Sequence, residues 1–77
     1  MKCKTILIAY QDDLPAKSLA TYFHRMGYRV EVAKLVSDVI RKVRSGNIHV
    51  ILLDDDIEGV KACDLVAIFK KINPRVQ

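Results

Sequence analysis

The sequence has no apolar run long enough to cross a membrane, and it has few cysteines. No apolar stretch approaches the roughly 20 residues that span a bilayer, and Met1 to Ile8 lacks the apolar core of a secretory signal. The two cysteines, Cys3 and Cys63, have neither CxxC nor Cys/His spacing. We therefore expect a cytoplasmic protein with reduced thiols and no structural metal or disulfide.

The chain is also short, and it contains no internal repeat or low-complexity segment. Its 77 residues, 51% hydrophobic and 29% charged, fit one globular domain. A chain of this size buries only about 60% of the surface that its unfolded form exposes. We therefore expect a single domain over residues 1–77 whose apolar faces need a partner or further sequence to cover them.

The net charge of +4 and the pI near 9.3 raise the question of nucleic-acid binding. The bases are scattered, however, and the only local basic run is Arg41, Lys42 and Arg44. A DNA-binding surface requires bases gathered on one face, whereas such a run indicates a solvated helix face. Most of the acids fall in two short clusters: Asp12, Asp13, Asp54, Asp55, Asp56 and Glu58.

Three short segments predict β-strands. Lys4 to Ala9 is an apolar, β-branched run that indicates a central strand buried on both faces. Tyr28 to Val32 alternates apolar and polar residues, which is typical of a strand near a sheet edge. His49 to Leu53 is a third apolar strand, and it runs directly into three aspartates.

Three helices are predicted after these strands. The first runs from about Leu14 to Met26, the second begins at a cap at Ser37 or its neighbour and closes at Ser45 and Gly46, and the third runs from Val60 to Ile72. Their expected buried positions are Leu19, Tyr22, Phe23 and Met26, then Val39, Ile40 and Val43, then Ala62, Leu65, Val66, Phe69 and Ile72.

Residues that are typical of helix ends support these predicted helices. Asp12 and Asp13 precede Pro15 as acids do at a helix start, Gly27 suits a left-handed C-terminal cap, and Pro74 stops the third helix.

Strands that alternate with helices predict an α/β fold with a parallel sheet. In such sheets ligands gather at the carboxyl ends of the strands. If the first and third strands are neighbours, Asp54 and the residues from Tyr10 to Asp13 face one crevice suited to a divalent cation.

The stretch from Lys4 to Arg75 resembles, without a gap, the receiver domain of bacterial response regulators. The segments that carry the resemblance are ILIAYQDD, MGYRVEVA, VIRKVRSGNIHVILLD and KKINPRV. The resemblance implies a flavodoxin-like, three-layer βαβαβα fold of strand order 2-1-3, which is the N-terminal part of the family's domain. The first helix would cover one face of the sheet and the second and third helices the other.

The resemblance also implies a function in two-component signal transduction. It places Asp54 where the family's aspartate accepts a phosphoryl group from a histidine kinase or phosphotransfer protein, as one step of a phosphorelay. The phosphorylated domain would then act on an output domain or partner protein, so we expect a signalling module rather than an enzyme. Nucleic acid would be contacted only through an output domain, and no membrane is expected among the partners.

Two features depart from the family's pattern. Tyr10 and Gln11 stand where the family has two acids, so we expect Mg²⁺ binding to be weakened, with Gln11, Asp12, Asp54 and Asp56 as candidate ligands. Asp56 would contribute its backbone carbonyl, while capping of the first helix is the plainer role for Asp12. Glu58 replaces a proline and leaves Gly59 in the turn. The family's phosphate-sensing Ser or Thr and its Lys would lie beyond Gln77.

Other interpretations remain open at this stage. The chain can be a degenerate receiver that acts as a phosphorylation-independent interaction or dimerisation module, and a small nucleic-acid-binding protein is a third alternative. A solvated acidic loop is a further interpretation of Asp54 to Asp56. We expect His24 to be a surface residue of its helix, His49 to begin a strand, and Cys63 to pack in its helix. The third strand would have an open edge, so we expect a homodimer or a piece of a longer chain.

Overall fold

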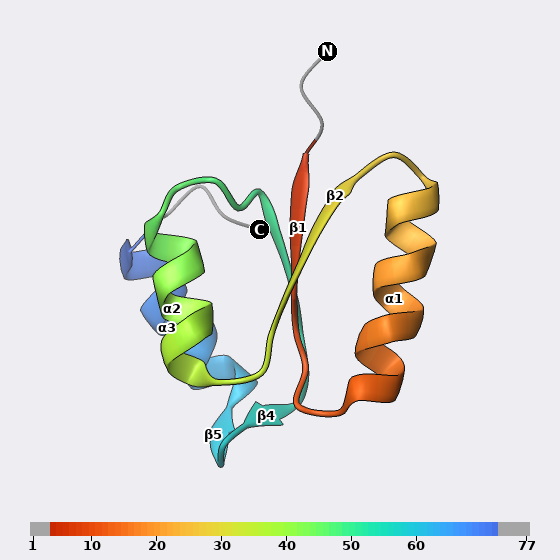
Figure 1. Cartoon of the computed structure of the whole chain (residues 1–77). Helices are drawn as coiled ribbons and strands as arrows, with labels where there is room; N and C mark the ends of the chain where they lie inside the picture. Colours follow the sequence, from red (N-terminus) through yellow and green to blue (C-terminus); the bar gives the residue numbers. More distant parts are fainter. Residues whose placement is uncertain (1–3, 73–77) are drawn as a thin grey trace.

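The structure is a computed structural model that describes residues 4–72. Within these residues, three parallel strands form a sheet of order β2-β1-β3: β1 (Thr5–Ala9), β2 (Arg29–Ala33) and β3 (Val50–Leu53). The helices are α1 (Asp13–Arg25), α2 (Val36–Arg44) and α3 (Ala62–Ile72). Figure 1 shows α1 on one side of the sheet and α2 and α3 on the other. The predicted three-layer βαβαβα fold with strand order 2-1-3 is confirmed.

The central strand β1 is buried along its whole length, as predicted. Its side chains alternate between two cores: Ile6 and Ile8 pack towards α1, and Leu7 and Ala9 pack towards α2 and α3. A strand with a core on each face needs apolar residues at every position. This explains why β1 has a continuous apolar run, whereas β2 at the edge alternates.

Helix α1 begins and ends where the local signals predict. The Asp12 side chain accepts a hydrogen bond from the Leu14 N–H at 3.3 Å, and Gly27 follows the helix at φ +94°. Leu19 and Phe23 pack against the sheet as expected, but the prediction was wrong for Tyr22 and Met26, which are 58% and 56% exposed. Tyr22 lies about 100° around the helix from Phe23. Met26 follows the last helical residue.

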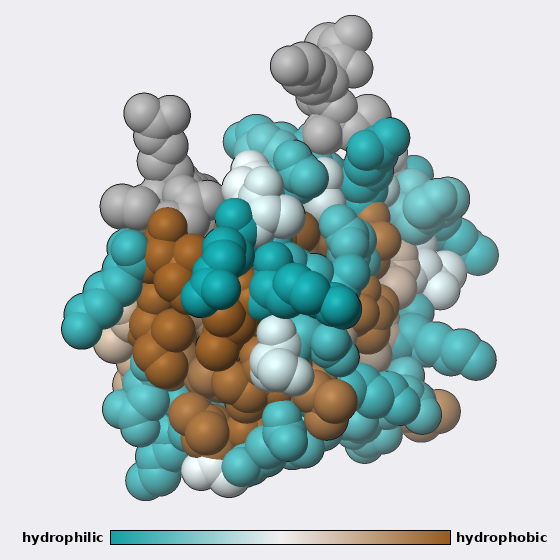
Figure 2. Space-filling view, turned by 60° about the vertical axis from the view of Figure 1, so that its left-hand side comes forward, coloured by the Kyte–Doolittle hydropathy of each residue, from teal (hydrophilic) through white to brown (hydrophobic). Residues whose placement is uncertain are grey.

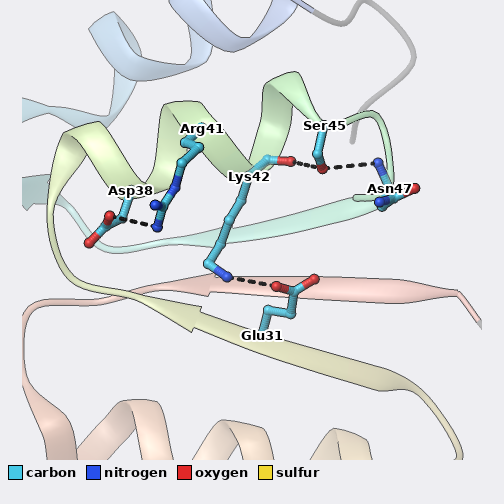
Figure 3. A network of polar contacts seen from close by, with 6 residues as sticks. All are labelled: Glu31, Asp38, Arg41, Lys42, Ser45 and Asn47. Carbon is cyan, nitrogen blue, oxygen red and sulfur yellow. Dashed lines mark hydrogen bonds and ion pairs between the residues drawn. The ribbon is translucent and has the colours of Figure 1, made fainter.

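Helix α2 begins one residue before the predicted cap. Leu35 occupies the cap position and makes no side-chain hydrogen bond, so the prediction of Ser37 as the cap was wrong. Val39 and Val43 are fully buried and Ile40 packs against them, as expected. At the other end the Ser45 hydroxyl donates to the Lys42 carbonyl at 2.6 Å and accepts from the Asn47 N–H at 3.4 Å (Figure 3).

A short hairpin precedes α3, and the sequence analysis missed it. Strands β4 (Asp56–Ile57) and β5 (Val60–Lys61) pair antiparallel, and the helix begins at Ala62 rather than at Val60. Glu58 and Gly59 form the two-residue loop, both with positive φ (52° and 79°), which is the backbone of a type I′ turn. Val60 fits the apolar spacing of the helix, which is why the helix was predicted to begin there. In the structure Val60 belongs to β5 and pairs with Ile57 of β4.

Helix α3 buries a narrower stripe than predicted. Leu65 and Phe69 are buried and Ile72 packs at the margin of the core, but Val66 is 45% exposed. Cys63 is also exposed, because it lies on the outer face of the helix, so the prediction that it packs was wrong. Pro74 and Cys3 lie outside the described residues.

Two surfaces of this fold remain uncovered within residues 4–72. Strand β3 pairs only with β1, so its outer edge has no neighbouring strand, as the sequence predicted. Val66 and Ile68 of α3 and Leu35 before α2 are exposed. Figure 2, which brings the α2 and α3 side forward, shows a continuous apolar patch there. No helix in this part of the chain is long and apolar enough to cross a membrane.

Candidate functional site at the carboxyl edge of the sheet

The carboxyl ends of the three parallel strands meet at one edge of the sheet. Ala9 at the end of β1 is in register with Ala33 of β2 on one side and with Leu53 of β3 on the other. The next residue of each strand therefore projects from the same edge. These residues are Tyr10, Lys34 and Asp54, so Asp54 and the turn after β1 lie at the same edge of the sheet.

Asp54 is half-buried and its main chain continues the sheet. Its N–H donates to the Ala9 carbonyl at 3.1 Å, one residue beyond the end of β3. Its carboxylate Oδ1 accepts a hydrogen bond from the Asp55 N–H at 2.8 Å. The ladder fixes the backbone of Asp54, and the second bond orients its carboxylate while leaving it accessible to solvent.

The turn after β1 contains two acids, Asp12 and Asp13, but both are engaged in other contacts at this edge of the sheet. Tyr10 packs into the core beneath α1, and Gln11 is exposed. Asp12 caps α1, which is the role that the sequence favoured for it. Asp13 lies in the first turn of the helix and pairs with Lys34, the residue that follows β2.

The Lys34 ammonium lowers the pKa of Asp13. The hydrogen bond between the two side chains is the largest cause, and their charge attraction and the charge of Lys17 act in the same direction. Asp13 therefore stays ionised to a lower pH than an aspartate without such a partner. This pair joins the start of α1 to the end of β2, so Asp13 acts structurally at the edge of the candidate site.

The residues after Asp54 form the short hairpin instead of an open acidic loop. The Asp55 carbonyl accepts from the Ala62 N–H at 2.8 Å, and Asp56 pairs with Lys61 across β4 and β5. Both aspartate side chains are exposed. Nowhere in residues 4–72 do three His, Cys, Asp or Glu side chains gather closely enough to hold a metal ion. The candidate ligand set of Gln11, Asp12, Asp54 and Asp56 stays a prediction.

No family model and no curated protein matches this sequence. Several solved structures match its fold, including the two that follow. The non-phosphorylated HemR receiver domain from Leptospira biflexa has a TM-score of 0.80 and 23% identity, over 97% of this chain and 60% of that one. The MaeR response regulator bound to beryllium trifluoride has a TM-score of 0.82 and 19% identity, over 95% of this chain and 62% of that one. The chain has the fold of a receiver domain. It spans about three-fifths of the length of these two chains.

The receiver fold contains one contact near the site that the sequence analysis missed. The Glu58 carboxylate accepts a hydrogen bond from the Val36 N–H, the first amide of α2, at 2.7 Å. A carboxylate at a helix N-terminus satisfies a free amide and opposes the positive end of the helix dipole. The hairpin after Asp54 thus supplies the cap that Leu35 lacks. The absence of a capping side chain before α2 is the signal that could have prompted a search for a distant one.

The histidines and the basic run do not belong to this site. His49 lies at the opposite edge of the sheet, where its Nδ1 accepts from the Thr5 N–H at 3.0 Å. His24 is exposed in the last turn of α1. In the basic run, Arg41 pairs with Asp38 at 3.0 Å and Lys42 with Glu31 at 2.6 Å (Figure 3). These pairs support the prediction of a solvated helix face.

Proposed function

We propose that this chain is a receiver module of two-component signalling and that Asp54 is the residue that accepts the phosphoryl group. The observation that supports the proposal most is the place of Asp54. It follows β3 directly, at the edge where β1 also ends, with its backbone held by Ala9 and its side chain half-exposed. A carboxylate so placed is accessible to a donor yet fixed in position.

The transfer we propose needs only a nucleophile and a phosphorylated donor. A carboxylate oxygen of Asp54 attacks phosphorus as the bond from phosphorus to the donor's imidazole nitrogen breaks, which yields an acyl phosphate and a free histidine. The donor is a histidine kinase or a phosphotransfer protein in the cytoplasm. The phosphorylated module then acts on an output domain, a partner protein or a second copy of itself.

The donor atoms near Asp54 fit Mg²⁺ poorly. Tyr10 and Gln11 supply no negative charge, and the Asp12 carboxylate already caps α1. Magnesium sites normally rely on carboxylates, because the ion gives up its water reluctantly. We therefore expect Mg²⁺ binding to be weak, and we assign no step of the transfer to it.

The second candidate is an interaction module that works without phosphorylation. The same poor donor set favours it, since such a module needs the receiver fold but not the acidic crevice. It differs from the first candidate in one measurable respect. Asp54 could then be replaced without changing any response of the domain.

The test is phosphorylation with a small-molecule donor. The natural full-length protein is treated with acetyl phosphate, or with beryllofluoride, in the presence of Mg²⁺, and examined by intact mass and by amide NMR spectra. The first candidate predicts a mass increase of one phosphoryl group after acetyl phosphate, and amide shifts centred on Asp54 with either reagent. Asp54→Asn should abolish both.

The control is Asp55→Asn, which removes the neighbouring exposed carboxylate and leaves its backbone in place. It should respond as the unmodified protein does. No response in any variant, together with no chemical-shift change on adding Mg²⁺, would favour the interaction module. Phosphorylation that survives Asp54→Asn would refute the assignment of the acceptor.

A further inference from the structure

An open groove of about 390 Å³ lies between α1 and β2, away from the carboxyl edge that holds Asp54. Its lining residues from the helix are Ala20, Thr21, His24 and Arg25, and those from the strand are Val30 and Val32. The floor is therefore apolar, with Val32 42% exposed. The rim is polar and carries the only ionisable side chains that line the groove, His24 and Arg25.

The strand that borders this groove also has an unused hydrogen-bonding edge. In the described sheet β2 pairs only with β1. The Arg29 N–H donates to the Lys4 carbonyl on the β1 side, at 3.0 Å. Because successive residues of a strand alternate in the direction of their backbone groups, Val30 and Val32 present their N–H and C=O groups to the open side. The groove and the free backbone groups thus belong to the same two residues.

The charge at the rim selects an acidic ligand. Neither the Arg25 nor the His24 side chain makes a hydrogen bond or ion pair with any other residue in the 4–72 range, and no acid lines the groove. A guanidinium with all its donors free binds a carboxylate through two parallel hydrogen bonds. No acid among the described residues lines the groove, so a carboxylate that pairs with Arg25 would belong to the molecule that occupies the groove.

We propose that this groove is a docking site for an extended segment of a partner protein, in which every second side chain faces the groove and these side chains include both acidic and small or β-branched apolar residues. The segment adds a strand beside β2 and bonds to the backbone of Val30 and Val32. Its apolar side chains cover Val30, Val32 and Ala20, and its carboxylates reach Arg25 and His24. Strand addition of this kind obtains affinity from the backbone and specificity from alternate side chains. The proposal does not depend on whether Asp54 is phosphorylated.

The test begins with selection of peptides from a random hexapeptide display library on the folded natural protein. We expect enrichment of Asp or Glu two positions away from Val, Ile or Thr, because residues two apart in a strand face the same side. Titration with a synthetic peptide of the enriched sequence should shift the amide signals of Val30 and Val32 and slow their hydrogen exchange, because each N–H gains an acceptor. Enrichment without acids, no enrichment, or unchanged exchange at these two amides would overturn the proposal.

The charge is tested by reversing Arg25. Arg25→Glu should weaken binding of the selected peptide by about tenfold or more, which is the scale of a hydrogen-bonded charge pair. The matched control is Arg44→Glu, since Arg44 is also an exposed arginine in the last turn of a helix, but on the other face of the sheet. It should bind as the unmodified protein does. Arg25→Gln gives the same comparison with a milder change should Arg25→Glu fail to fold.

The remaining outcome concerns a second copy of this chain as the occupant. Protection of the Val30 and Val32 amides that appears without peptide and grows with protein concentration would show self-pairing of β2 edges. That result would replace the partner segment by a second copy and refute the proposal as stated.

Discussion

Within residues 4–72, the face of the sheet beneath α2 and α3 buries nine residues in one cluster, whereas the face beneath α1 buries three. The larger cluster draws on β1, β2, both helices and the hairpin, and the smaller one on β1 and α1 alone. On the α1 side Leu19, Phe23 and Tyr28 pack only at the margin. The same central strand thus supports a closed core on one face and a partly open one on the other.

The two faces also differ in where the caps of their helices come from and in how buried their ion pairs are. Helix α1 is capped by its own neighbour Asp12, whereas α2 is capped by Glu58, 22 residues further along the chain. On the α2 side the partly buried pair of Lys42 and Glu31 also joins a helix to the sheet (Figure 3). The α2 and α3 side thus has a long-range helix cap and a partly buried ion pair, whereas the α1 side has a local cap and an exposed ion pair, that of Asp13 with Lys34.

The largest expected effect comes from removing a leucine from each core. Leu65→Ala, at a fully buried position, should lower the free energy of unfolding by about 2–5 kcal/mol. Leu19→Ala should cost less, because Leu19 is already half-exposed. Urea unfolding followed by circular dichroism measures both. Equal losses would break the comparison between the two faces.

Leu65→Ala can leave too little folded protein to measure, given total stabilities of about 5–15 kcal/mol. Ile57→Val is then the milder variant, since Ile57 is equally buried in the same core. It should cost about 0.5–1.5 kcal/mol.

The next effect concerns the two helix caps. Asp12→Ala and Glu58→Ala should each cost about 1 kcal/mol, but the regions that they loosen should differ. Asp12→Ala should speed amide exchange only in the first turn of α1. Glu58→Ala should speed it at Val36 and in the hairpin together, because the one contact joins both.

Glu58→Gly separates the two roles of Glu58. It also removes the carboxylate, but glycine accepts the positive φ at no steric cost. It should therefore be less destabilising than Glu58→Ala by roughly 0.5–1 kcal/mol. Glycine and alanine variants of equal stability would contradict the left-handed turn.

A smaller effect is expected for the ion pairs of α2. A double-mutant cycle on Glu31 and Lys42 should give a coupling of about 0.2–1 kcal/mol. A cycle on Asp38 and Arg41, an i,i+3 pair within the helix, should give about 0.2–0.5 kcal/mol. A coupling for Glu31 and Lys42 below that of the local pair would mean that this long-range contact adds nothing to the α2 side.

The sequence predicted the elements whose signals are local. Asp12 before Pro15, Gly27 after the first helix and the uninterrupted apolar run of β1 each determine a feature within a few residues. The position of Asp54 followed for the same reason, because it comes directly after an apolar strand. The expectation that Asp12 serves as a cap was confirmed by its hydrogen bond to the Leu14 amide.

The predictions from the sequence were wrong or incomplete where contacts between distant residues determine the local structure. Nothing around Leu35 indicates that its helix is capped by Glu58, since the two become neighbours only once β3 pairs beside β1. The hairpin was missed because Glu58 is an unusual residue at positive φ, where asparagine, aspartate or glycine is the usual signal. The wrong assignment of Tyr22 arose because helical spacing gives several apolar stripes, and the sheet selects one of them.

The smallest expected effect concerns the ion pair on the α1 side. Lys34 lowers the pKa of Asp13 below its ordinary value of 3.8. A carboxyl whose pKa is lower in the folded state stabilises the fold above its ordinary pKa, and the stabilisation disappears as pH falls through the folded pKa. Lys34→Gln should therefore raise the pKa of Asp13 towards its ordinary value, as measured by NMR titration of the side-chain carboxyl carbon. Lys42→Gln, the matched change on the α2 side, should leave it unchanged. Asp13→Asn should be less stable than the unmodified chain near neutral pH and lose that difference as pH falls through the lowered pKa of Asp13. Because the pair is exposed, salt should reduce the difference as well. A difference that persisted at acidic pH and high salt would mean that Asp13 supports α1 by packing rather than by charge.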